Sequence, residues 1–458
     1  MDKITEIKEH IKKVYLAYNR PLVVGYSGGK DSTVVMQLVW DAIEELPREQ
    51  LKQDVHVIST DTLVETPYII DYVATTLEQI NQTARASNLP IYAHRLTPLF
   101  KNSFWVNLIG KGYPAPSRNF RWCTERLKIE PVNRFISEHV DKWGEATVVL
   151  GARRDESSSR AQVLSSKARD HMGLSKHPTL PAAFVFTPIE EMTTDDVWAY
   201  LLSHKCQWGG NNRDLAAMYQ NASGGECPMV VDTSTPSCGS SRFGCWTCTL
   251  VQQDTTMENL IDNGEEWMTP LLEFRDFLSD TQDVEKKHIY RSHKRRDGQV
   301  AYVRDGTRIA YGPYKLEWRK TFLERLLQIQ IDIQQHGPDP TVKLISFDEL
   351  ELIRDFWREE EWTDSVPEIY QRISGENHGW LDDDGVKYSL EDFQLLRQFC
   401  EEAGINPALP TKLIDQERRM HGMSRRSGIL QKIDRIFSEE WRSEEEILES
   451  LGMTYDIQ

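Results

Sequence analysis

The chain has 458 residues, of which 39% are hydrophobic and 27% are charged, and its formal net charge at neutral pH is −17. This composition excludes a disordered or fibrous protein and predicts two or three globular domains. No apolar run approaches the roughly 18 residues that a membrane span requires, and the first residues are too polar for a secretory signal. We therefore expect a cytoplasmic protein that does not bind membranes.

The acidity is concentrated near the carboxyl end of the chain. Residues 336–458 hold 14 Lys and Arg against 28 Asp and Glu, so this segment contributes −14 to the net charge. The rest of the chain is close to neutral. The overall charge therefore does not exclude a nucleic-acid partner, although the acidic segment is a poor candidate for its main binding surface.

Apolar runs alternate with stretches of helical periodicity, which predicts an α/β fold. Strands are expected at 22–26, 55–59, 91–96 and 146–151, and helices at 1–20, 31–46 and 67–87. This alternation is typical of a parallel doubly wound sheet, in which ligands bind at the carboxyl ends of the strands. We expect three regions, which are an α/β domain at 1–204, a loop-rich cysteine and basic region at 205–335, and an acidic, mainly helical region at 336–458.

A glycine-rich turn joins the first expected strand to the following helix. It consists of Ser27, Gly28, Gly29, Lys30, Asp31 and Ser32. Glycines let backbone N–H groups approach phosphate oxygens, the helix N-terminus adds partial positive charge, and Lys30 adds a full charge. The turn is not a Walker A loop, because Asp31 follows the lysine. Asp61, after the second strand, is either close to the bound phosphates or a helix N-cap.

This turn resembles the pyrophosphate loop of the ATP pyrophosphatases, which split ATP between its α- and β-phosphates. The resemblance implies that the six residues of the turn hold pyrophosphate, that Asp61 lies near the nucleotide, and that Mg²⁺ accompanies ATP. Lys30 and Asp31 are the catalytic residues that it implies within the turn.

Arginines and serines follow the fourth expected strand, in the segment 151–160. Guanidinium groups match phosphate oxygens in geometry, so this segment is a candidate anion site, with a solvated polar loop as the alternative. The segment resembles the G-x-R-x-x-E-S-x-x-R element of the phosphoadenosine phosphosulfate (PAPS) reductases. We expect its arginines to hold ATP or an acceptor phosphate, namely Arg153, Arg154 and Arg160.

Four of the seven cysteines fall within 22 residues, at Cys227, Cys238, Cys245 and Cys248. In a reduced protein, four thiols this close indicate one metal centre, either zinc or an iron–sulfur cluster. The surrounding sequence resembles the DndC and SspD group of DNA phosphorothioation proteins, over about residues 20–330. The resemblance implies a [4Fe–4S] cluster on these four cysteines.

Cys123 stands apart from this group, close in sequence to Arg121, Arg126 and Lys128. Neighbouring cations lower the pKa of a thiol, so Cys123 is a candidate nucleophile or persulfide carrier. The alternative is a small buried residue beside a phosphate-binding strip. The two remaining cysteines, Cys206 and Cys400, are predicted to be packing residues.

A basic stretch lies downstream of the cysteines. Its cations are Lys286, Lys287, Arg291, Lys294, Arg295 and Arg296. Such a stretch is typical of a surface that contacts the phosphate backbone of DNA without reading its sequence. A solvated loop, or a patch that docks the acidic tail of the same chain or a partner, is the alternative.

The motifs and the resemblance together predict an ATP-dependent sulfurtransferase of a DNA phosphorothioation system. Its expected partners are DNA, a cysteine desulfurase as sulfur donor, and sister proteins of the same system. Three alternatives stay open, which are a PAPS or adenylyl-sulfate reductase, a tRNA-thiolating ATP pyrophosphatase, and a non-catalytic assembly subunit.

Overall fold

The computed structural model describes residues 2–222, 244–303, 308–358, 360–361, 364–380, 390–420 and 428–450. They form two compact units, of which the first combines residues 1–99 with 121–272 and the second combines 100–120 with 273–458. This grouping differs from the three consecutive regions expected from the sequence. The difference arises because a short segment in the first half of the chain packs with helices from its second half.

The first unit is built on a six-stranded sheet with the strand order β3-β2-β1-β4-β6-β5. The strands are β1 (Leu22–Gly25), β2 (Val55–Thr60), β3 (Ile91–Leu96), β4 (Ala146–Val149), β5 (Ser175–Lys176) and β6 (Ala183–Phe186). All are parallel to their neighbours except β5, which runs antiparallel to β6. The four strands expected from the sequence are confirmed, and β5 and β6 extend the sheet.

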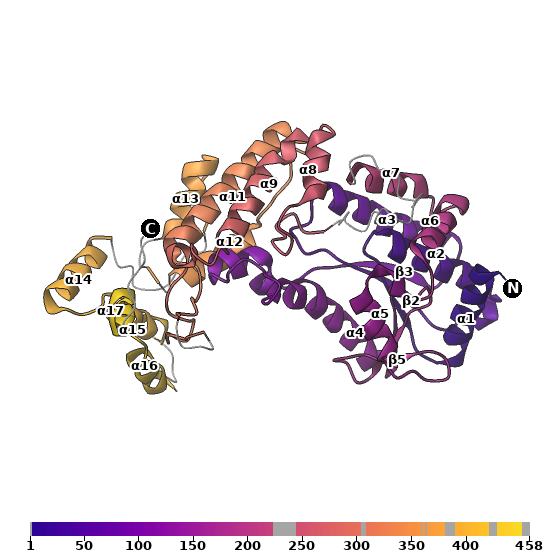
Figure 1. Ribbon diagram of the computed structural model, residues 1–458, viewed down its shortest axis with the longest axis horizontal. Helices are drawn as coiled ribbons and strands as arrows, with labels where there is room; N and C mark the ends of the chain where they lie inside the picture. The colour runs from indigo at the N-terminus through magenta and orange to yellow at the C-terminus, as the bar shows by residue number, and fades with distance from the viewer. Residues whose placement is uncertain are drawn as a thin grey trace. The chain divides into compact units, whose positions relative to one another are not determined.

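Helices cover both faces of this sheet (Figure 1). The helices of this unit are α1 (Lys3–Ala17), α2 (Lys30–Glu44), α3 (Pro67–Ala86), α4 (Glu130–Trp143), α5 (Ser158–Ser165), α6 (Thr194–Ser203), α7 (Asn212–Ala222) and α8 (Thr255–Asp262), of which α8 packs against α7 rather than the sheet. Val24 and Val57 face a core shared with α1, α2, α3, α6 and α7. Their neighbours Val23 and Ile58 point the other way, toward α4. The structure confirms the parallel doubly wound fold.

Helix α2 determines where the glycine-rich turn lies. Most of its side chains are buried, including Val34, Val35 and Trp40, and a helix that is apolar on most sides belongs in a core. Because α2 follows β1 in the middle of the sheet, its N-terminus and the turn before it are held at the carboxyl edge of the strands. The fold therefore fixes the turn at the edge where doubly wound sheets bind ligands.

The second unit is helical, as the sequence predicts for the carboxyl-terminal region. Its helices are α9 (Thr269–Asp280, which begins in the first unit), α10 (Lys287–Tyr290), α11 (Leu316–His336), α12 (Phe347–Trp357), α13 (Ser365–Ser374), α14 (Leu390–Ala403), α15 (Ala408–Met420), α16 (Ile429–Phe437) and α17 (Glu444–Ser450). Segment 100–120 is tied to them by buried indoles. Trp105 Nε1 donates to the Leu344 carbonyl at 2.6 Å, and Trp357 Nε1 donates to the Ile109 carbonyl at 2.9 Å.

Although α11 is 21 residues long, it carries charged side chains along its length. Neither α11 nor any other helix in the described part of the chain combines the length and the apolar character that a membrane crossing requires.

Three histidines meet on the face of the sheet that α4 covers. His56 from β2 and His94 from β3 face each other, with 3.1 Å between His56 Nδ1 and His94 Nε2. The ring of His139 from α4 lies 4.3 Å from that of His56, centroid to centroid. His56 is buried, and its Nε2 has no hydrogen-bond partner among the described residues. Burial, with the charges of His139 and His94, lowers the pKa of His56 to about 3.

This depressed pKa predicts that the first unit loses stability in mild acid. In the unfolded chain, His56 becomes protonated below its pKa of about 6.5. In the folded protein, His56 stays neutral down to about pH 3, so acid favours the unfolded state. The free energy of unfolding should therefore fall by about 2 kcal/mol between about pH 8 and pH 5. Urea unfolding of the His56→Asn variant, whose amide can keep the link to His94, should show a shallower pH dependence. The exposed His171→Asn variant is the matched control, and an unchanged slope in His56→Asn contradicts the prediction.

Candidate nucleotide site

A cavity of about 570 Å³ lies at the carboxyl ends of the central strands of the first unit. Its lining includes Ser27, Asp31 and Ser32 from the turn after β1, Asp61 after β2, and Gly151 after β4. The strand order reverses between β1 and β4, and ligands of doubly wound sheets bind at this reversal. The volume is in the range that small-molecule and cofactor sites occupy.

The turn after β1 requires glycine at one position and offers donors at two. Gly28 has φ +75°, and a Cβ there would lie 2.8 Å from Val73 Cγ2. Gly29 is the N-cap of α2. Within the described residues, neither the Gly28 nor the Gly29 N–H donates a hydrogen bond, whereas the Lys30 N–H donates to the Tyr219 hydroxyl at 3.3 Å. The turn thus presents N–H groups at a helix N-terminus, which suits phosphate oxygens.

Asp31 is held by two cations. Arg153 Nε donates to Asp31 Oδ1 at 2.6 Å, and Lys30 Nζ donates to Asp31 Oδ2 at 3.0 Å. The Arg153 side chain is 1% exposed and also donates to the Met192 carbonyl. Arg153 therefore ties the loop after β4 to the start of α2, and its guanidinium does not line the cavity. The expectation that it faces a phosphate finds no support in this placement.

The other two arginines of the segment differ in position. Arg154 forms ion pairs with Glu190 and Glu191, at 2.6 and 2.8 Å, and does not line the cavity. Arg160 does line it, and its half-exposed guanidinium lies 3.2 Å from Glu156. Only Arg160 of the three predicted arginines is therefore placed to meet a ligand in this cavity.

Asp61 lies at the cavity beside an arginine that no sequence motif singles out. The Arg95 guanidinium donates two hydrogen bonds to Asp61, and the Leu63 N–H donates to Asp61 Oδ1 at 2.8 Å. The N-cap of α3 is Thr66, so the alternative of a helix N-cap does not hold for Asp61. Arg95 could have been found from strand register, because it pairs with Ser59 just before Asp61 on the neighbouring strand.

The described part of the cysteine segment is joined to the wall of this cavity. The Trp246 N–H donates to the Val64 carbonyl at 3.0 Å, and Cys245 forms a backbone bridge with Glu65, which lines the cavity. The Cys245 thiol donates to Glu65 at 3.7 Å, and its Sγ lies 3.2 Å from Thr62 Oγ1. Burial raises the pKa of the Cys245 thiol and of the Glu65 carboxyl. Sulfur and the nucleotide cavity are therefore separated by a single layer of side chains.

Lys128 is the charged group common to the cysteines and the cavity. Its side chain lines the cavity, and the charge of Cys245 chiefly raises its pKa, with contributions from Cys123 and Cys248. Glu65, whose carboxylate lies 4.0 Å from the Lys128 ammonium, also raises this pKa. The expectation of a lowered pKa for Cys123 is wrong, because burial raises the pKa of its thiol more than Lys128 lowers it.

The remaining cysteines divide between packing positions and the undescribed segment. Cys206 packs against the main core of the first unit, and Cys400 is buried, as predicted for both. Cys227 and Cys238 lie outside the described residues. Among the described residues, no three His, Cys, Asp or Glu side chains are arranged to hold a metal ion, so the four-cysteine centre stays a prediction.

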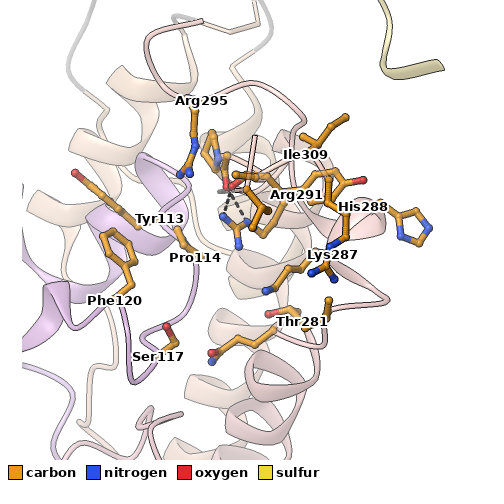
Figure 2. Close-up of a pocket in the computed structure, with 18 of the residues that line it drawn as sticks. Tyr113, Pro114, Ser117, Phe120, Thr281, Lys287, His288, Arg291, Arg295 and Ile309 are labelled. Carbon is orange, nitrogen blue, oxygen red and sulfur yellow. Dashed lines mark hydrogen bonds between the residues drawn. The ribbon is translucent and has the colours of Figure 1, made fainter. Parts of the chain in front are cut away.

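The basic stretch lies in the second unit, where five of its six predicted DNA-contacting cations line a larger cavity (Figure 2). These five are Lys286, Lys287, Arg291, Arg295 and Arg296. Arg291 is turned inward and donates to the Tyr311 and Gly312 carbonyls. Lys294 does not line the cavity, and its ammonium lies over the Trp441 ring, 4.3 Å from the centroid.

The fold and the cavity define a nucleotide-binding type of α/β protein, with a glycine-rich turn after the first strand and cysteines against the cavity wall. A comparison with protein families identifies the family within this class. The chain belongs to the phosphoadenosine phosphosulfate reductase domain family, which matches residues 21–251, about half of its length.

Curated relatives are distant and uncharacterized. The proteins MJ0066 and MJ0973 of Methanocaldococcus jannaschii are each 26% identical to the chain, over 290 and 194 residues. The first alignment covers 62% of this chain and 49% of the relative, and the second covers 42% and 39%. The chain thus spans about half the length or less of the curated relatives it matches.

Two solved structures are similar over part of the fold. The PAPS reductase of Candida auris, in a phosphate complex, is 14% identical, with a TM-score of 0.29 over 50% of this chain and 89% of that one. The U34-tRNA thiolase NcsA of Methanococcus maripaludis, with its [4Fe–4S] cluster, is 15% identical, with a TM-score of 0.29 over 61% of this chain and 79% of that one.

Proposed function

We propose that the protein is an ATP pyrophosphatase-type sulfurtransferase that modifies the DNA backbone in a phosphorothioation system. The observation that carries this proposal is the junction between Cys245 and the loop from Thr62 to Glu65, which walls the nucleotide cavity. A sulfurtransferase needs an activated oxygen and a sulfur source close to each other. The resemblance to the DndC and SspD group supports DNA as the acceptor.

The turn and the cavity suit transfer of AMP to an oxygen acceptor. A phosphodiester oxygen attacks the α-phosphorus of ATP, and pyrophosphate leaves on the N–H groups of Gly28 and Gly29 with Lys30 as counter-charge. A hydrosulfide then attacks the activated DNA phosphorus, the P–S bond forms, and AMP departs with the oxygen. With hydrosulfide as the nucleophile, this exchange requires no added electrons. Arg160 and Lys128 line the cavity where the additional negative charge develops.

The proposal includes two groups that would accompany this chemistry. Mg²⁺ typically binds one or two carboxylates together with nucleotide phosphates, and Asp31 and Asp61 offer carboxylates at the cavity. A [4Fe–4S] cluster would be held by Cys227, Cys238, Cys245 and Cys248. Burial raises the pKa of the Cys245 thiol, whereas the charge of Lys128 lowers it and so favours the thiolate that a cluster requires. Such a cluster would supply a site for binding sulfide. Cys123 stays a candidate sulfur carrier.

The test follows both products of one reaction. Protein purified without oxygen is incubated with ATP labelled at the α-phosphate, plasmid DNA, a cysteine desulfurase supplied with ³⁵S-cysteine, and a thiol reductant that releases the persulfide sulfur of the desulfurase as hydrosulfide. We expect AMP and pyrophosphate to form and ³⁵S to enter DNA in proportion to AMP. Parallel reactions offer tRNA in place of DNA, or PAPS with a thiol reductant.

Each other outcome contradicts the proposal in a different way. Sulfur entering tRNA but not DNA identifies a tRNA-thiolating enzyme. Sulfite release from PAPS identifies a reductase. If the sister proteins modify DNA equally well when this chain cannot form AMP, the chain is a non-catalytic subunit.

A further inference from the structure

A cavity in the second unit is larger than a small-molecule site. Its volume is about 2080 Å³, about twice the upper end for cofactor and drug-sized ligands. Its lining comes from segment 113–120, from residues 281–303 and 308–313, and from Arg435 and Leu448 in α16 and α17. All of these residues belong to the second unit.

The cavity has an excess of positive charge that the protein does not neutralise. Seven Lys and Arg side chains line it, against two carboxylates. In the described part of the chain, Lys287, Arg295, Arg308 and Arg435 form no ion pair with a carboxylate, although Lys286 pairs with Asp280 at 2.5 Å. Burial, with the charges of Arg291 and Arg308, lowers the pKa of Lys287. Four cations without carboxylate partners therefore face a common space.

The acidic tail is engaged elsewhere on the basic stretch. The Glu440 N–H donates to the Gly298 carbonyl at 3.0 Å, and Lys294 lies over Trp441. Glu439 is paired with Lys412 from α15 at 2.6 Å. The predicted alternative of an acidic tail docking on the basic stretch thus applies to the hairpin around Lys294 and Gly298. In the described part of the tail, no carboxylate pairs with Lys287, Arg295 or Arg308, and the fourth cavity cation, Arg435, belongs to the tail itself.

The opposite wall carries aromatic rings. Tyr113 and Phe120 lie 6.0 Å apart, centroid to centroid, and are inclined by 31°. Arg296 lies over the Tyr113 ring at 4.9 Å, while Phe120 is 42% exposed. Figure 2 shows the two rings on one side of the cavity, with Lys287 and Arg291 on the other. A groove with cations on one wall and rings on the other is typical of sites for unpaired nucleic-acid strands, where bases stack and phosphates meet cations.

We propose that this cavity binds an unpaired stretch of DNA, with phosphates on Lys287, Arg295 and Arg308 and a base stacked on Phe120. The inference deepens the proposed function, and it rests on that function for the choice of DNA over RNA. The site would thus hold the acceptor strand by its sugar-phosphate chain and one base.

Fluorescence anisotropy with a short labelled single strand of DNA, in the absence of ATP, tests the proposal on the full chain. The single strand should bind more tightly than a blunt duplex of the same sequence. Arg295→Ala with Arg308→Ala should weaken binding at least about tenfold and reduce the slope of log affinity against log salt by about 0.7 for each phosphate that no longer meets a cation. Phe120→Ala should weaken binding about tenfold, and Phe120→Trp, which keeps a stacking face, should restore it.

Lys101→Ala, an exposed cation of the same unit outside the cavity, is the matched control and should bind normally. Equal binding of duplex and strand, or full binding by the double variant or by Phe120→Ala, overturns the inference. Tighter binding of the same sequence as RNA overturns the choice of DNA. AMP formation is measured on the same variants. Absence of single-strand binding by the wild type, with AMP formation and ³⁵S entry into DNA both intact, contradicts this inference alone. Intact single-strand binding without AMP formation contradicts the proposed function alone.

Discussion

Replacing Lys30 with Ala should lower the rate of AMP formation by about 10²–10³-fold, the loss typical when one preorganised group that stabilises developing charge is removed. Lys30 lies at the first position of α2, and its ammonium is held between Asp31 at 3.0 Å and the Tyr219 ring at 5.6 Å from the centroid. This placement directs a full positive charge toward the turn where pyrophosphate would leave. The measurement is AMP release from labelled ATP under single-turnover conditions.

The fold should not suffer from this change. In the Lys30→Ala variant, Asp31 keeps its hydrogen bond from Arg153, so the thermal unfolding midpoint should stay close to that of the wild type. Lys13→Ala removes an exposed lysine of α1 and should leave both AMP release and the midpoint unchanged. A loss of less than about tenfold in Lys30→Ala would place the pyrophosphate away from this turn.

The backbone around Lys30 could be predicted because its signals are local. The three buried strands β1, β2 and β4, and a helix that is apolar on most sides, carry their pattern in a few consecutive residues. The structure explains the glycine at position 28, because its positive φ and the nearby Val73 exclude a side chain there. Strand order, and with it the edge where the turn lies, follows from the rules for parallel α/β sheets.

The roles of individual arginines could not be predicted in this way. Arg153 and Arg160 occupy the same motif, yet Arg153 is buried against Asp31 while Arg160 lines the cavity. Nothing in the sequence of β3 marks Arg95 as a site residue. Its position beside Asp61 becomes evident only from the register between β3 and β2. An arginine side chain reaches several residues away, so its partner depends on tertiary contacts that sequence spacing does not encode.

Long-range packing also explains the other differences from expectation. Cys123 is half-buried and interacts with Cys248, which is distant in sequence, and desolvation outweighs the neighbouring cations in its pKa. The basic stretch was predicted as one surface, but the hairpin at Lys294 docks on the tail while Lys287 and Arg295 face the cavity. A count of charges along the chain cannot separate these two groups, because they alternate within a few residues.

Replacing Asp31 with Ala should destabilise the first unit as well as abolish AMP formation. Arg153 is 1% exposed, and Asp31 is the carboxylate that accepts from its Nε at 2.6 Å. Arg153 keeps a longer ion pair from its Nη1 to the more exposed Asp155 at 3.3 Å, so removing Asp31 leaves the Nε side of the buried guanidinium uncompensated. We expect a cost of about 3 kcal/mol, the low end for a broken buried ion pair. For a unit of this size, the thermal midpoint should fall by roughly 6–12 °C. Asp141→Asn, an exposed carboxylate of α4, is the matched control and should leave the midpoint unchanged.

A double variant separates the structural role of Asp31 from its role in the reaction. In Asp31→Asn with Arg153→Met, both charges are gone and the methionine fills a similar volume, so most of the lost stability should return. AMP formation should not return, because Lys30 then lacks the carboxylate that holds its ammonium at the turn. Recovery of both stability and AMP formation in the double variant would mean that Asp31 serves only to neutralise Arg153. Recovery of stability alone assigns Asp31 a second task, the positioning of the lysine that meets the leaving pyrophosphate.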